Sequence, residues 1–101
     1  MRIMLACALG MSTGMLVERM REAAKAEGKD YEVWAVDVGS VDQNEFDVLL
    51  LGPQVTYLLS DMEAKYGDKV PVKVIKPVDY GRMNGKAVVK FAEDLIAAYK
   101  K

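Results

Sequence analysis

The sequence RIMLACALGMSTGM occupies residues 2–15 and contains the only cysteine of the 101-residue chain. The apolar run before Cys7 is too short for a core helix and predicts a buried strand. Two glycines and two hydroxyl residues follow Cys7, which is typical of a turn that leads into a helix. A strand, a glycine-bearing turn and a helix in this order predict the beginning of an α/β fold.

The rest of the chain continues this alternation of short apolar runs and amphipathic segments. Charged residues recur at three- and four-residue steps through residues 12–27, which predicts a helix with Met15, Leu16 and Met20 on its inner face. Two further helices are predicted over residues 55–66 and 85–99, and three further strands over residues 31–38, 48–51 and 72–75.

The connections between these elements predict the topology of the sheet. Near-continuous apolar strands suit a parallel sheet that is covered on both faces. Residues 38–47 are too few for a good crossover helix, so we expect an irregular crossover with one short turn at residues 42–45. Right-handed crossovers then predict strand order 2-1-3-4. The predicted fold is one α/β domain over residues 1–101, a four-stranded parallel open sheet with three helices on both faces.

The composition excludes several classes of protein. One cysteine and no histidine leave neither a disulfide framework nor a cysteine-based zinc site, so we expect no metal and no cofactor. The net charge is −1 and the basic residues are scattered, which argues against nucleic acid as a partner. No apolar run approaches the roughly 20 residues of a membrane span. A free thiol suits a reducing compartment, so we expect a cytoplasmic protein.

The predicted topology brings two loops together. Ligands of open α/β sheets bind beyond the carboxyl ends of the strands, at the point where the strand order reverses. Here that point lies between the first and third strands. The segment after Cys7 follows the first strand, and Gly52, Pro53 and Gln54 follow the third. We therefore expect the candidate site at this edge of the sheet.

The segment after Cys7 has the chemistry of an anion site. Gly10 and Gly14 allow the backbone to turn, so that several N–H groups converge, and Ser12 and Thr13 add hydroxyl donors. A helix N-terminus at the same place favours negative charge. Such a site stabilises a thiolate nucleophile and also binds a phosphoryl group. The alternative is a buried cysteine that packs as a small apolar residue.

Three motifs resemble one family. They are CALGMSTGML at residues 7–16, LLLGPQV at residues 49–55 and VDYGRMNG at residues 78–85. Together they resemble the enzyme IIB component of the lactose/cellobiose/chitobiose branch of the bacterial sugar phosphotransferase system. The chain departs from the family pattern at Leu9, where serine or alanine is usual, and at Gly14, where serine is usual.

The resemblance implies a phosphoryl relay. Cys7 would accept a phosphoryl group from a histidine of the IIA component and pass it to a sugar bound by the membrane IIC component. Gln54 is either a neighbour of this site or a solvent-facing residue at a helix N-terminus, and Asp79 and Tyr80 are expected to cap or pack. The phosphoryl oxygens would be held by Ala8, Leu9, Gly10, Met11, Ser12, Thr13 and Gly14.

Two other classes of protein are consistent with parts of the pattern. Low-molecular-weight tyrosine phosphatases and arsenate reductases have a similar fold and a cysteine in the same loop. Their loop ends in an arginine six residues after the cysteine, where this chain has Thr13, and Asp79 is the only candidate for their general acid. A flavodoxin-like module that binds a nucleotide or flavin would explain the loop, but it leaves the thiol unexplained.

Overall fold

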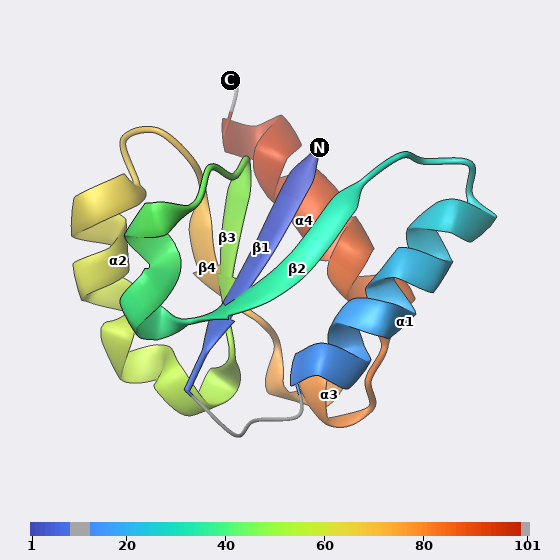
Figure 1. Cartoon of the computed structure of the whole chain (residues 1–101), viewed down its shortest axis with the longest axis horizontal. Helices are drawn as coiled ribbons and strands as arrows, with labels where there is room; N and C mark the ends of the chain where they lie inside the picture. The colour runs from blue at the N-terminus through green and yellow to red at the C-terminus, as the bar shows by residue number, and fades with distance from the viewer. Residues whose placement is uncertain (9–12, 100–101) are drawn as a thin grey trace.

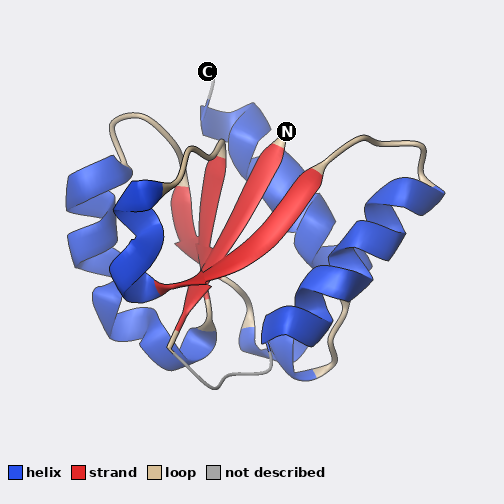
Figure 2. Cartoon of the chain, in the orientation of Figure 1, coloured by secondary structure: helices blue, strands red, loops and turns tan. Residues whose placement is uncertain are grey.

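The computed structural model describes residues 1–8 and 13–99. Within these residues four strands form one parallel sheet in the order β2-β1-β3-β4, which confirms the predicted topology. Figure 2 shows the strands as one twisted layer with helices on either side. The strands are β1 (Arg2–Cys7), β2 (Glu32–Asp37), β3 (Val48–Leu51) and β4 (Val72–Val74).

Helices cover both faces of the sheet (Figure 1). The pair α1 and α4 lies on one face, and α2 with the two 3₁₀ segments lies on the other. No helix in the described part of the chain is long and apolar enough to cross a membrane. The bounds are α1 (Thr13–Ala26), η1 (Val38–Gln43), η2 (Pro53–Leu58), α2 (Leu59–Tyr66), α3 (Pro77–Gly81) and α4 (Gly85–Tyr99).

The central strand divides the core into two halves. Ile3 and Leu5 of β1 are fully buried against α1 and α4, whereas Met4 and Ala6 are fully buried against the other layer. Successive strand residues point to opposite faces, and both faces are covered, so every residue in the run must be apolar. This explains why the strand has no polar alternation.

The three long helices are present as predicted, but the short helical segments differ from the expectation. The helix expected at residue 55 begins earlier, as the 3₁₀ segment η2, with Pro53 in its first turn and a kink at Val55. The crossover turn begins earlier than expected and overlaps the predicted residues 42–45 only in part, because η1 begins at Val38, where the Asp37 carboxylate caps it by accepting the Gly39 N–H at 3.0 Å. The helix α3 is not among the predicted helices: β4 ends at Val74, and Pro77 lies in the first turn of α3, a position that proline suits.

Met15 of α1 is exposed, although it was expected on the inner face of the helix. Met15 is 57% exposed, whereas Leu16 and Met20 are fully buried. Consecutive residues of a helix point about 100° apart, so Met15 falls outside the stripe that faces the core. Its exposure is relevant to the function, because it lies in the first turn of α1.

A polar cluster joins the segment that follows α1 to the middle of α4. The Lys29 ammonium donates to the Glu93 carboxylate of α4, and the Tyr31 hydroxyl donates to the same carboxylate at 2.5 Å. These two hydrogen bonds, that from Lys29 first, lower the pKa of Glu93. The carboxylates of Glu93 and Glu27 in turn raise the pKa of Lys29. The cluster lies far along α1 from its N-terminus, so it concerns stability rather than the site.

Candidate functional site

The carboxyl ends of the strands meet at one edge of the sheet, and Cys7 is the last residue of β1 (Figure 1). It is in register with Asp37, the last residue of β2. On the other side, the Gly52 N–H continues the β1–β3 ladder and donates to the Ala6 carbonyl at 3.0 Å. The loops that follow β1 and β3 therefore start side by side, as predicted.

Cys7 is a free cysteine with 9% of its surface exposed. Burial alone would also fit an apolar packing role. Its position is more informative, because β1 ends at Cys7 and α1 begins at Thr13. Cys7 is thus the strand residue directly before the connection to α1, and the positive end of a helix dipole favours an anion.

The predicted phosphate-binding residues divide into two groups. Ala8 directly follows β1 and packs against the core on the α2 side, while Thr13 and Gly14 are the first two residues of α1. Leu9, Gly10, Met11 and Ser12 lie outside the described residues. Gly14 is helical, in agreement with the helix predicted over residues 12–27, so the turn suggested at Gly14 does not occur; among the described glycines only Gly28 has a positive φ.

Thr13 makes a contact that the sequence does not reveal. It is 1% exposed, and its Oγ1 lies 3.0 Å from the hydroxyl oxygen of Tyr80 in α3. Tyr80 is 6% exposed, which agrees with the packing role expected of it. The two residues are 67 positions apart, so no local pattern could report their hydrogen bond. The sequence does indicate that the two residues are related, because both lie in motifs that resemble the same family.

Gln54 lies beside the candidate site. It belongs to η2 and is exposed, and its Oε1 is 3.0 Å from the point that a Cβ atom on Gly52 would occupy. The same point is 3.6 Å from the Cβ atom of Cys7. Gln54 is therefore solvent-facing, and it adjoins the residue that packs on Cys7; its role at the site stays a prediction.

The structure bears directly on the phosphatase alternative. The arginine of that class would stand at Thr13, whose side chain is almost fully buried and is paired with Tyr80. Arginine is much larger than threonine, and burying its charge there without a partner would be strongly unfavourable. Thr13 therefore cannot be regarded as an arginine position that has merely been substituted.

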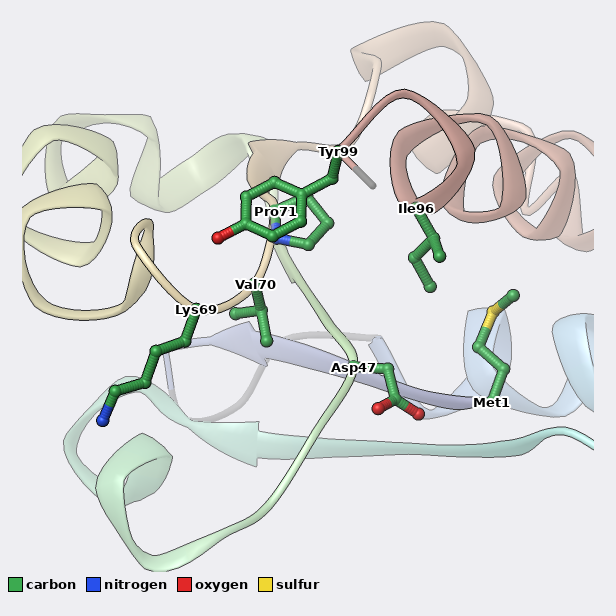
Figure 3. Close-up of a pocket in the computed structure, with 7 residues that line it drawn as sticks. All are labelled: Met1, Asp47, Lys69, Val70, Pro71, Ile96 and Tyr99. Atoms are coloured by element: carbon green, nitrogen blue, oxygen red, sulfur yellow. The ribbon is translucent and has the colours of Figure 1, made fainter. Parts of the chain in front are cut away.

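A hollow of about 450 Å³ lies elsewhere (Figure 3). Met1, Asp47 and Pro71 line it, and each comes directly before a strand or the segment leading into one. It therefore opens at the amino ends of the strands, opposite Cys7. Because ligands of this fold class bind at the carboxyl ends, we do not assign the function to this hollow.

Comparison with known proteins identifies the family of the chain. The family model described as "PTS system, Lactose/Cellobiose specific IIB subunit" matches residues 2–91. A galactose-specific EIIB component and a cellobiose-specific EIIB component, both from Lactococcus lactis, are each 44% identical to the chain over 93% of its length and 94% of theirs. An oligo-beta-mannoside-specific EIIB component from Bacillus subtilis is 38% identical over 94% of the chain and 95% of that protein.

Solved structures give the same result. The solution structure of a cellobiose-specific phosphotransferase IIB component from Borrelia burgdorferi has a TM-score of 0.81 and 33% identity, over 98% of this chain and 94% of that one. A lactose-specific IIB component domain from Streptococcus pneumoniae shares the fold, with a TM-score of 0.84 at 14% identity over 94% and 96% of the two chains. The chain belongs to the lactose/cellobiose-specific IIB subunits of the phosphotransferase system, which are phosphotransferase components of sugar transport.

Proposed function

We propose that this chain is a phosphoryl carrier that holds the transferred group on the sulfur of Cys7. The observation that supports this most strongly is the position of the single cysteine at the carboxyl end of β1, directly before the connection to α1. The chain has no histidine, so it lacks the other side chain that commonly carries a phosphoryl group in a relay. A thiolate is a stronger nucleophile than the hydroxyls of the following segment or the carboxylate of Asp37, which ends β2 beside Cys7, so Cys7 is the proposed carrier.

The proposed relay has two steps. In the first, the Cys7 thiolate attacks the phosphorus of a phosphohistidine on the IIA partner, so that an S–P bond forms while the P–N bond breaks and the imidazole leaves as a neutral group after taking up a proton. In the second, a hydroxyl oxygen of the sugar bound by the IIC component attacks the phosphorus, the S–P bond breaks, and the hydroxyl proton is released. The thiolate is thereby regenerated, and the chain supplies positioning and charge stabilisation to both steps.

The phosphoryl oxygens are the part of the substrate that this domain, residues 1–101, would bind. In the proposal, N–H groups of the segment from Ala8 to Gly14 and the hydroxyls of Ser12 and Thr13 hold them, with Gln54 as a neighbour. Support comes from α1, a 14-residue helix that begins at Thr13. The unpaired N–H groups and the dipole at its N-terminus stabilise negative charge on a phosphoryl group.

Exposed apolar side chains indicate where protein partners dock. Among the described residues, three of the four exposed large hydrophobic side chains are Met15, Tyr57 and Val78. They belong to α1, η2 and α3, which lie at the edge that contains Cys7 (Figure 1). An apolar surface around a reacting atom suits a partner that must exclude water during transfer. We propose that the IIA and IIC components use this surface in turn, in the cytoplasm.

The sugar is proposed to belong to the lactose/cellobiose class. Relatives named for galactose and for cellobiose are equally identical to this chain, at 44%. Such equality fits a carrier that passes its phosphoryl group to a sugar held by another component. The described residues of this edge accordingly need to recognise the phosphoryl group and two proteins, and not the sugar itself.

The test is the intact mass of the protein after incubation with phosphoenolpyruvate and the upstream relay proteins. We expect the wild-type protein to gain about 80 Da, the mass of one phosphoryl group. Cys7→Ser should show no stable adduct and should retain the circular dichroism of the wild type, because serine is nearly isosteric with cysteine. An adduct of the same mass on folded Cys7→Ser protein would contradict the assignment.

A further inference from the structure

The hydrogen bond between Thr13 and Tyr80 links the proposed site to a distant part of the chain. Thr13 is almost fully buried, with 1% of its surface exposed, although its side chain is polar. Its partner belongs to α3, a short helix that follows β4. Among the described residues, the hydroxyl of Thr13 and the hydroxyl of Tyr80 each have the other as hydrogen-bond partner. A buried hydroxyl without a partner is unfavourable, so the pair is strongly held together.

Backbone contacts fix the position of Tyr80. Its N–H donates to the Lys76 carbonyl at 3.0 Å, and its carbonyl accepts the Met83 N–H at 3.1 Å. Two residues beyond Met83, the backbone of Gly85 lies so close to α1 that a Cβ atom there would overlap the backbone of Arg19 and Met20. The bond to Lys76 lies within α3 and its N-cap, whereas the close contact at Gly85 packs the turn after Tyr80 against α1 and so limits how far the phenol can shift from Thr13.

The chemistry of two hydroxyls sets the direction of the hydrogen bond during function. A hydroxyl donates one proton and accepts through its lone pairs. If the Tyr80 phenol donates to Thr13 Oγ1, the Thr13 proton is free to donate to an anion. A hydroxyl that accepts one hydrogen bond becomes a stronger donor in the next. A phosphoryl group on Cys7, six residues before Thr13, would be such an anion and would favour this direction.

We infer that Tyr80 is a positioning residue for phosphoryl transfer: it donates to Thr13 Oγ1 and directs the Thr13 hydroxyl proton toward the phosphoryl group on Cys7. This inference rests on the proposed function. Tyr80 acts through Thr13, so its removal should alter the environment and the reactivity of phosphorylated Cys7 while the thiol itself remains. Partners that orient a ligating or catalytic group typically contribute about 10-fold to 100-fold.

The test compares Tyr80→Phe, which removes one oxygen and keeps the ring, with the wild type. We expect a changed ³¹P chemical shift of the phosphocysteine and about 10-fold slower transfer at saturating partner concentration. Tyr66→Phe is the matched control, since its ring packs edge-on against Phe46 in the other half of the core. It should leave both measurements as in the wild type.

Variants of Thr13 keep the inference testable if Tyr80→Phe does not fold. Thr13→Val should reproduce the ³¹P change and the slower transfer, and Thr13→Ser, which retains the hydroxyl, should restore both. The double variant Tyr80→Phe/Thr13→Val should be no slower than Thr13→Val alone. If the double variant slows transfer by the product of the two single effects, Tyr80 and Thr13 act independently and the inference is overturned.

Two further results distinguish a failure of this inference from a failure of the proposed carrier function. If wild-type protein gains a phosphoryl group on Cys7 but folded Tyr80→Phe has the wild-type ³¹P shift and transfers within twofold of the wild-type rate, the role of Tyr80 is disproved and the carrier function stands. If wild-type protein gains no phosphoryl group, the carrier function fails and the role of Tyr80 with it.

Discussion

Gly52 packs directly against Cys7 across the β1–β3 pair: a Cβ atom on Gly52 would lie 3.6 Å from the Cβ atom of Cys7. The same atom would lie 3.0 Å from Gln54 Oε1, which is closer than an ordinary van der Waals contact. The absence of a side chain at Gly52 therefore allows the Gln54 amide to approach the neighbourhood of the thiol. This relationship gives the Gly-Pro-Gln segment a physical role beside the candidate site.

Gly52→Ala should displace the Gln54 side chain without disturbing the fold. Gly52 has φ −62° and ψ 146°, which alanine adopts easily, and the free energy of unfolding should stay within about 1 kcal/mol of the wild type. If Gln54 contributes to transfer, Gly52→Ala and Gln54→Ala should slow it to a similar extent, and the double variant should be no slower. Urea unfolding and phosphoryl transfer rates provide the two measurements. A normal rate in Gln54→Ala would show that Gln54 has no part in transfer.

Removal of the exposed apolar side chains at the Cys7 edge should weaken partner binding. Tyr57→Ala and Val78→Ala remove side chains that are 76% and 55% exposed. We expect each to raise the concentration of IIA component needed for half-maximal phosphorylation by about 10-fold, as for a substantial interface residue. Tyr99→Ala is the control, because Tyr99 is also exposed but lies at the end of α4 and lines the hollow at the opposite edge. Equal effects of all three variants would argue against this docking surface.

Gly85→Ala should destabilise the fold through the contact between α1 and α4. The new methyl group would overlap the carbonyl carbon and oxygen of Arg19 and the nitrogen of Met20. Backbone atoms cannot rotate away, so the helices must separate, and we expect a loss of about 1–3 kcal/mol in the free energy of unfolding. This loss exceeds the gain of up to about 1 kcal/mol from the higher helix propensity of alanine.

Gly81→Ala is the matched control for Gly85→Ala. A Cβ atom on Gly81 would have no neighbour within 4 Å, and Gly81 lies in α3 without a positive φ. We expect its free energy of unfolding to equal or slightly exceed that of the wild type. Urea unfolding measures both variants, and a Gly85→Ala protein as stable as Gly81→Ala would contradict the close approach of the helices.

The Lys29–Glu93 cluster should make stability depend on pH. Because the pKa of Glu93 is lowered in the folded protein, the carboxylate stabilises the fold above its ordinary pKa of 4.5, and this contribution is lost as the pH falls through the lowered value. Lys29 has a raised pKa, so its contribution is complete below the ordinary 10.5 and is lost only as the pH rises through the raised value. At neutral pH the wild type should therefore have a higher melting temperature than Glu93→Gln.

Thermal melting between about pH 3 and pH 7 checks this dependence, since the titration spans the ordinary pKa of a carboxylate. The difference in melting temperature between wild type and Glu93→Gln should narrow below about pH 4.5. Asp94→Asn is the control, because Asp94 pairs with Lys90 at 3.2 Å on a highly exposed surface, where an ion pair contributes little. A difference that stays constant across this range would show that the charge of Glu93 is not what stabilises the cluster.

The sequence by itself determined the sheet and the place of the candidate site. Strands such as β1 and β3 are short apolar runs, and helices such as α1 and α4 have charged residues at helical spacing. The local pattern of apolar and charged residues therefore predicts which residues are buried. The handedness of crossovers then favoured the strand order 2-1-3-4, and this order places Cys7 beside the Gly52 loop. Each step needed only neighbouring residues and a general rule of chain geometry.

Only the tertiary structure decided how the elements meet around that site. The pairing of Thr13 with Tyr80 joins residues 67 positions apart, and it exists because α3, a helix too short to show periodicity, packs against the first turn of α1. The exposure of Met15 likewise depends on the rotation of α1 about its axis, which its contact with α4 at Gly85 sets. Such contacts arise from the packing of complete helices, and the local sequence of either helix does not contain them.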